Sequence, residues 1–232
     1  IIEIQKILID QIHVLETMTP MDFLDFRDFL IPASGFQSVQ FRKIENKLGL
    51  KVEDRYTYGD ANYCTYLHES DQEKIKASES EKSLFDLMES WLERTPFLNW
   101  GETSFWDEYE QAVSNMLHDD RRLIETNEKL SVIEKEKHLT EYAKTEVSFG
   151  VVLDKTLHNK MVEDGNWRLS LKATQAALLI QLYRDQPILL NPYRLLTKLA
   201  DIDELFTTWR YRHALMVSRM IGRKIGTGGS TG

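Results

Sequence analysis

The segment near the end of the chain carries the residue types best suited to chemistry. Trp209, His213, Met216 and Met220 recur every three or four residues, so they share one face of a helix. A single imidazole in an apolar groove is the kind of group that ligates the iron of a porphyrin. One hypothesis from this spacing is a haem-binding helix with His213 as the iron ligand.

Two neighbouring features fit the same hypothesis. Arg212, Arg219 and Arg223 form a second stripe beside the apolar face, where guanidinium groups can pair with porphyrin carboxylates. The glycine-rich segment 226–232 offers backbone N–H groups and hydroxyls to a small anion or zwitterion. The same pattern is more often that of a packed core histidine and a solvated arginine face, with the glycine-rich segment as a flexible tail, so these residues alone favour that interpretation over haem binding.

A second candidate site lies nearer the start of the chain. Phe23 and Arg27 are one helical turn apart, so an aromatic ring and a bidentate carboxylate receptor can meet one ligand. Ser34 and Gly35 follow in the adjoining segment. The alternative, which these residues alone favour, is that Phe23 packs in the core while Arg27 pairs with Asp28 or another nearby aspartate.

Composition restricts the class of protein. The chain has 232 residues, 42% of them hydrophobic, which suffices for one substantial core with a small inserted subdomain. A net charge of −8 without a long basic run argues against nucleic acid or an anionic membrane as a partner. Cys64 is the only cysteine, which excludes an internal disulfide and indicates a reducing, cytoplasmic setting. Neither a membrane span nor a signal peptide is visible.

Apolar residues recur at helical spacing along most of the chain, without strand-like alternation, so the sequence predicts an all-α fold. The predicted architecture is a helical bundle whose core is formed by residues 1–99 and 161–232, with residues 100–160 as an inserted charged helical subdomain. Residues 51–79 are predicted to be irregular. A helix is predicted to open at Asn191-Pro192, and residues 201–203 are predicted to form a junction before the His213 helix.

The remaining titratable residues carry no site signal. Five histidines are scattered and are predicted to be surface or edge residues: His13, His68, His118, His138 and His158. Cys64 has no nearby base that would activate it, and the acidic residues show no paired-carboxylate spacing.

Several longer segments resemble one family. They are Leu15–Arg27 (LETMTPMDFLDFR), Pro32–Arg42 (PASGFQSVQFR), Trp91–Pro96, Asp201–Asp203, Trp209–His213 and the terminal GTGGSTG. Together, and in this order, they are similar to the tryptophan 2,3-dioxygenases across nearly the whole chain, with the stretch from about residue 100 to 158 least alike.

The resemblance implies an all-helical, homotetrameric enzyme with haem b that inserts both atoms of O2 across the indole C2–C3 bond of L-tryptophan. The product is N-formyl-L-kynurenine, in the first step of the kynurenine pathway. By motif, His213 corresponds to the proximal haem ligand and Arg27 to the residue that holds the substrate carboxylate. Phe23 would line the indole pocket with Leu30, Ser34 and Gly35 close by, and Thr227 would receive the ammonium and carboxylate end of the substrate.

One departure from the family affects the catalytic residues. The family's distal histidine lies in a motif similar to T-H-Q-A-Y-E-L-W, which these 232 residues lack, as they lack the helices after the glycine-rich loop. Ile1 also begins inside an apolar helical pattern, so we expect an internal piece of a longer chain that cannot complete the oxygenation site by itself. The alternatives are a non-catalytic haem-binding protein and a helical interaction protein.

Overall fold

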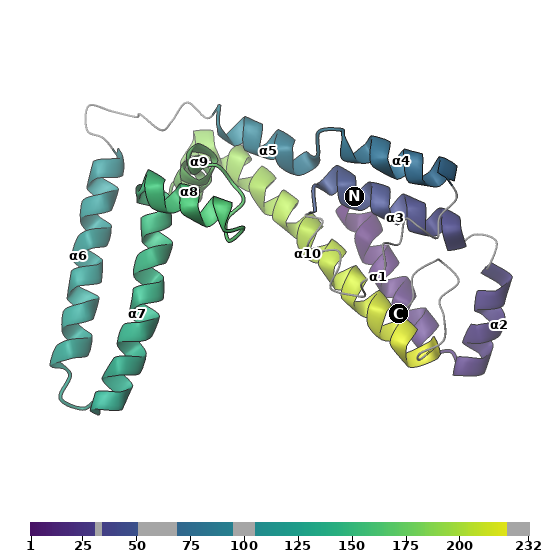
Figure 1. Cartoon of the computed structure of the whole chain (residues 1–232), viewed down its shortest axis with the longest axis horizontal. Coiled ribbons are helices and arrows are strands. Elements are labelled where there is room, and N and C mark those ends of the chain that lie inside the picture. The colour runs from purple at the N-terminus through teal and green to yellow at the C-terminus, as the bar shows by residue number, and fades with distance from the viewer. Residues whose placement is uncertain (31–33, 51–68, 95–104, 222–232) are drawn as a thin grey trace. The chain divides into compact units, whose positions relative to one another are not determined.

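The computed structural model describes residues 1–30, 34–50, 69–94 and 105–221, without the side chains of 27–30, 34–38 and 221. In these ranges all regular structure is α-helical, as the sequence predicted (Figure 1). The helices are α1 Ile2–Glu16, α2 Pro20–Leu30, α3 Ser34–Leu48, α4 Glu69–Glu79, α5 Leu84–Leu92, α6 Phe105–Thr126, α7 Val132–Leu153, α8 Lys155–Glu163, α9 Leu171–Leu182 and α10 Pro187–Ile221.

The helices divide into two compact units. Residues 1–87 and 191–232 form the first unit, and residues 88–190 form the second. The first unit contains the helices that carry the candidate site residues, including most of α10. The division of the chain at residues 99 and 160 stays a prediction.

An apolar cluster holds α1 and α2 against α10 in the first unit. Its buried members are Ile12, Phe23, Met216 and Met220. Leu15, Met18, Trp209 and Val217 pack around them. One polar contact joins α1 to α10 further along, where the Gln5 side-chain amide donates to the backbone carbonyl of Ile202 at 2.9 Å. Met216 and Met220 of the predicted apolar face are therefore buried against the first two helices, while Trp209 is half-buried and His213 is exposed.

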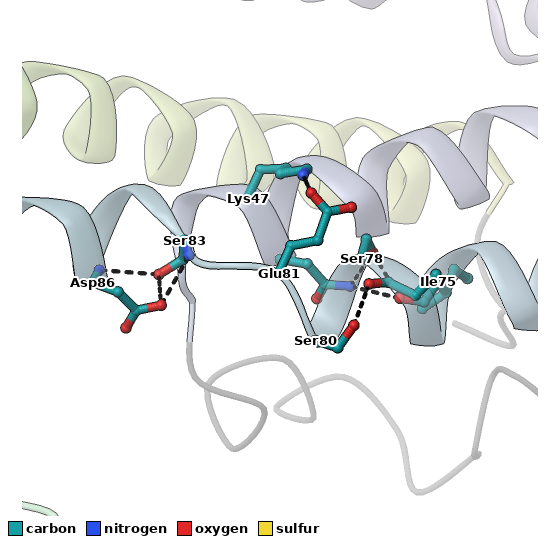
Figure 2. A network of polar contacts seen from close by, with 9 residues as sticks. Lys47, Ile75, Ser78, Ser80, Glu81, Ser83 and Asp86 are labelled. Carbon is teal, nitrogen blue, oxygen red and sulfur yellow. Dashed lines mark hydrogen bonds and ion pairs between the residues drawn. The ribbon is translucent and has the colours of Figure 1, made fainter.

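Polar contacts fix α3 against α4, and Figure 2 shows them at close range. The Asn46 amide donates to Ser78 Oγ at 2.7 Å and to the Ile75 carbonyl at 3.3 Å, in a site closed to solvent. At the surface, Lys47 forms an ion pair with Glu81. The buried amide specifies the register of the two helices, because moving it would leave polar groups unpaired.

A glycine makes the turn that ends α3. Gly49 has φ +83°, and its N–H donates to the Glu45 carbonyl at 3.0 Å, closing the helix. A Cβ at this position would lie 2.5 Å from Ser83 Oγ and 2.8 Å from Phe85 Cβ. Ser83 and Asp86 cap the start of α5 there, each side chain accepting from the other's backbone N–H (Figure 2). Both the backbone angle and the close approach require glycine.

Two features of the helices differ from the sequence-based predictions. Helix α10 is continuous from Pro187 to Ile221, so residues 201–203 are not a junction and Asn191-Pro192 is not a helix start. An ion pair of 2.9 Å between Lys198 and Asp201 supports the helix where a break was expected, and Pro192 removes only one hydrogen bond near the N-terminal end. The predicted irregular range 51–79 contains helix α4, while its residues 51–68 lie outside the described ranges.

In the second unit, α6 and α7 lie side by side as a charged helical hairpin (Figure 1). Ser131 and Glu134 form a capping box at the start of α7. At the start of α9, Ser170 caps the helix and is itself bound by two carboxylates, with Glu89 accepting from its N–H and Glu93 from its hydroxyl, both at 2.7 Å. These contacts tie the end of α5 to α9.

The prediction that His158 is a surface or edge residue was wrong. The residue is only 1% exposed. Its Nδ1 lies 2.8 Å from the Val151 carbonyl oxygen, and its Nε2 lies 2.9 Å from that of Leu169. The ring therefore joins α7 to the segment before α9. No spacing pattern surrounds His158 in the sequence, because its partners are backbone carbonyls rather than side chains.

We predict that Gly49→Ala destabilises the first unit by about 2–5 kcal/mol, because it adds both a left-handed backbone penalty and a steric clash. Gly165→Ala is the matched control. Gly165 has φ +73° but open space around its Cβ position, so only the backbone penalty of about 1–2 kcal/mol applies. Urea denaturation followed by circular dichroism measures both. Equal losses in the two variants would contradict the close approach at Gly49.

Candidate functional site

Four rings from α3 and α10 form a continuous series, which we call the aromatic stack: Phe206, Phe41, Trp209 and His213. The Phe41 centroid lies 5.2 Å from that of Phe206, at an interplanar angle of 16°. Trp209 follows at 5.1 Å from Phe41, tilted by 34°. The His213 ring then lies flat on Trp209, with centroids 5.0 Å apart and an angle of 11°. Helical spacing brings the α10 rings into line, and α3 supplies the ring between them.

The environment of His213 favours a neutral imidazole. Surrounding protein lowers the pKa of His213 below its ordinary value through desolvation, which disfavours the charged ring. The residue is nevertheless exposed over part of its surface, since stacking on Trp209 covers the ring without enclosing it. Within the described ranges of the chain the imidazole makes no hydrogen bond or ion pair. A neutral, reachable nitrogen lone pair is what a metal ion requires of histidine.

A buried carboxylate lies beside the aromatic stack. Glu45 is one turn beyond Phe41 on α3, and its side chain is fully buried. Arg42 donates to its Oε2 at 2.6 Å, and Arg210 of α10 approaches its Oε1 at 3.8 Å. Two guanidinium groups therefore compensate the buried charge, and one of them belongs to the residue that follows Trp209. Glu45 was not among the residues predicted from the sequence, because its burial depends on the packing of α3 and not on local spacing.

Arg212 is held by α1. Its guanidinium contacts His13 Nε2, and because a guanidinium only donates, that nitrogen is the acceptor. His13 Nδ1–H then donates to Glu16 Oε2 at 3.2 Å. From the sequence, Arg212 was predicted to share a helix face with two other arginines that can pair with porphyrin carboxylates. The structure gives it a partner on α1, while Arg219 of the same stripe is exposed and Arg223 lies outside the described residues.

The structure brings together only some of the predicted site residues. Phe23, 6% exposed, packs with Met216 and Met220 in the cluster on the His213 helix. Arg27 and Leu30 belong to α2, and Ser34 and Gly35 begin α3. The side chains of these four residues, and all of Thr227, lie outside what the structure describes. Their proposed contacts with a ligand therefore stay predictions.

The described residues contain no cluster of three or more His, Cys, Asp or Glu side chains that could hold a metal ion. They also contain no helix long and apolar enough to cross a membrane. The metal site predicted at His213 stays a prediction. The described residues define an all-helical protein in which His213 stacks on Trp209.

Comparison with known proteins gives the family. A sequence profile of the tryptophan 2,3-dioxygenases matches residues 1–232. Among curated relatives, the tryptophan 2,3-dioxygenase of Bdellovibrio bacteriovorus is 52% identical over 232 residues, covering 100% of this chain and 65% of the relative. That of Dictyostelium discoideum is 49% identical, with 100% and 58% covered. That of Xenopus laevis is 45% identical, with 99% and 56% covered.

The chain belongs to the tryptophan 2,3-dioxygenase family, since both the profile and these relatives match essentially its whole length. It spans between 56% and 65% of the length of these three relatives. The resemblance noted in the sequence is thereby confirmed.

Proposed function

We propose that this chain carries the proximal haem ligand and the substrate-binding segment of an enzyme that oxidises L-tryptophan with O2. The reaction adds both oxygen atoms across the indole C2–C3 bond and gives N-formyl-L-kynurenine. The observation that supports this most strongly is the His213 ring, neutral and stacked on Trp209 in a chain of this family. Following the family resemblance, we also propose a homotetramer in the cytoplasm.

The residues around His213 fit haem b. One imidazole with its lone pair available can hold the iron. Met216 and Met220 of the same helix are buried against Ile12 and Phe23, so this cluster anchors the His213 helix rather than facing a ligand. Haem, when bound, would supply the iron that activates O2, while the electrons that reduce O2 come from the indole C2–C3 bond that is cleaved. His213 would hold that iron. Because its pKa is lowered, little protonated imidazole competes with iron binding near neutral pH.

The other residues bind and orient the amino acid. In this proposal Arg27 receives the substrate carboxylate as a two-pronged donor, and Thr227 binds the ammonium and carboxylate end. Phe23, Leu30, Ser34 and Gly35 line the indole site and exclude water. Fixing both ends of the substrate lowers the entropic cost of reaction, so catalysis by these residues is mainly positioning. The distal histidine of the family has no counterpart in these 232 residues.

Two other functions would use only some of these residues. A non-catalytic haem-binding protein needs His213 but neither Arg27 nor Thr227, and a helical interaction protein needs none of them. Formation of the N-formylkynurenine chromophore from L-tryptophan separates the proposed enzyme from both, when it is measured with a reductant and O2 on the haem-loaded chain together with the family's distal-histidine segment.

We predict that His213→Ala abolishes stoichiometric haem binding while helical content is retained, because the only proposed protein ligand to iron is lost. Haem titration followed at the Soret band, with circular dichroism in parallel, measures both properties. His118→Ala is the matched control, since His118 is exposed on α6 in the second unit. Unchanged haem affinity in His213→Ala would overturn the assignment.

We predict that Arg27→Ala lowers kcat/KM for L-tryptophan by an amount equivalent to about 2–4 kcal/mol, the scale of a lost bidentate charged contact. Arg27→Lys should restore little of it, since an ammonium cannot reproduce the fork. The control is an indole substrate without the carboxylate, for which the loss should be small. Equal losses for both substrates would make Arg27 a structural residue instead.

A further inference from the structure

We propose that Phe41 is a positioning residue for His213: it fixes the plane of the iron-ligating imidazole through Trp209. That His213 ligates iron rests on the proposed function. The ring contacts themselves belong to the protein without haem, so they can be tested separately.

The geometry of the aromatic stack sets the imidazole plane. A histidine that ligates iron from an exposed helix face can turn about its side-chain bonds unless something holds the ring. Here the ring lies flat on Trp209, at 5.0 Å and 11°. The indole is therefore the surface that orients the imidazole, and the imidazole is only as fixed as the indole.

Trp209 in turn depends on α3. Phe41 contacts Trp209 at 5.1 Å and also stacks on Phe206 at 5.2 Å. Phe206 is itself buried and precedes Trp209 by nearly one turn of α10. A ring from α3 thus fills the space between two rings of α10. Without Phe41, the Trp209 ring would lose the ring contact from α3 and keep its stacking contact with His213.

The register of α3 on α10 is fixed independently of the rings. Glu45 follows Phe41 by one turn and is fully buried, and its carboxylate lies against Arg210 of α10 as well as Arg42. Arg42 lies on α3 and moves with Glu45, so sliding α3 along α10 would separate the buried carboxylate from Arg210 only, which is disfavoured for a buried charge. Phe41 is therefore held at the height of Trp209.

This arrangement links the two ends of the proposed site. Helix α3 begins with Ser34 and Gly35, which are proposed to contact the substrate, and Phe41 lies about 9 Å further along the helix axis. The same rigid helix thus carries the substrate segment and the support of the iron ligand. Neither Phe41 nor Glu45 touches iron or tryptophan in this account.

The test combines haem-free and haem-loaded protein. Without haem, NMR of the whole protein should show nuclear Overhauser contacts from Phe41 to Trp209 and from Trp209 to His213, with the His213 ring protons shifted upfield by the indole. Phe41→Leu should remove most of that upfield shift, and Phe41→Tyr, which keeps the ring, should restore it. Tyr211→Leu is the control, because Tyr211 is an exposed ring of α10 outside the aromatic stack.

With haem, resonance Raman spectroscopy of the ferrous protein should show the iron–histidine stretch shifted or broadened in Phe41→Leu, but not in Phe41→Tyr or Tyr211→Leu. Absence of the ring contacts in the wild-type protein would overturn the proposal, and this test needs no variant to fold. An unchanged chemical shift of the His213 ring protons in Phe41→Leu would overturn it as well. Haem binding retained in His213→Ala would instead overturn the proposed function and leave the haem-free ring contacts standing.

Discussion

The packing of α3 on α10 is the contact on which the rest of the candidate site depends. Phe41 and Glu45 lie one turn apart on α3, and they meet Phe206, Trp209 and Arg210 of α10. The rings supply apolar contact, and the buried Glu45 carboxylate adds an ion pair of 3.8 Å with Arg210 of α10. This combination determines where Trp209 lies, and Trp209 determines how His213 is presented.

The arginines of α10 and His213 differ in their polar contacts. Arg210 and Arg212 each have a partner on another helix, the first at Glu45 of α3 and the second at His13 of α1. His213, which follows them, makes no such contact in the described residues and has a lowered pKa. The arginines thus tie the helix to its neighbours, while the imidazole remains neutral and available. A cationic His213 would lose the lone pair that iron needs.

The helical spacing of apolar residues along most of the chain predicted the all-α class. The same spacing within one helix predicted that His213 shares a face with Trp209, Met216 and Met220. The burial of Phe23 against Met216 and Met220 matches one of the two alternatives that the sequence left open for this residue. What remained hidden depends on contacts between distant residues. Glu45, Phe41 and the partner of Arg212 become significant only once α1 and α3 are packed on α10.

Two errors have similarly physical causes. His158 is buried because two backbone carbonyls accept its ring, and backbone partners leave no pattern in a sequence. Helix α10 passes through Pro192 and residues 201–203, because one lost hydrogen bond near a helix end is small beside the contacts of a 35-residue helix. In both cases tertiary structure decided an outcome that the local sequence pattern did not show.

The central claim is that one site combines the iron ligand with recognition of L-tryptophan. The most direct measurement is the Soret band of the haem-loaded protein during titration with L-tryptophan, with an indole that lacks the amino-acid end as comparison. The account predicts a saturable perturbation by L-tryptophan that is much weaker with the comparison compound. A haem spectrum that L-tryptophan leaves unchanged at saturating concentration would contradict it.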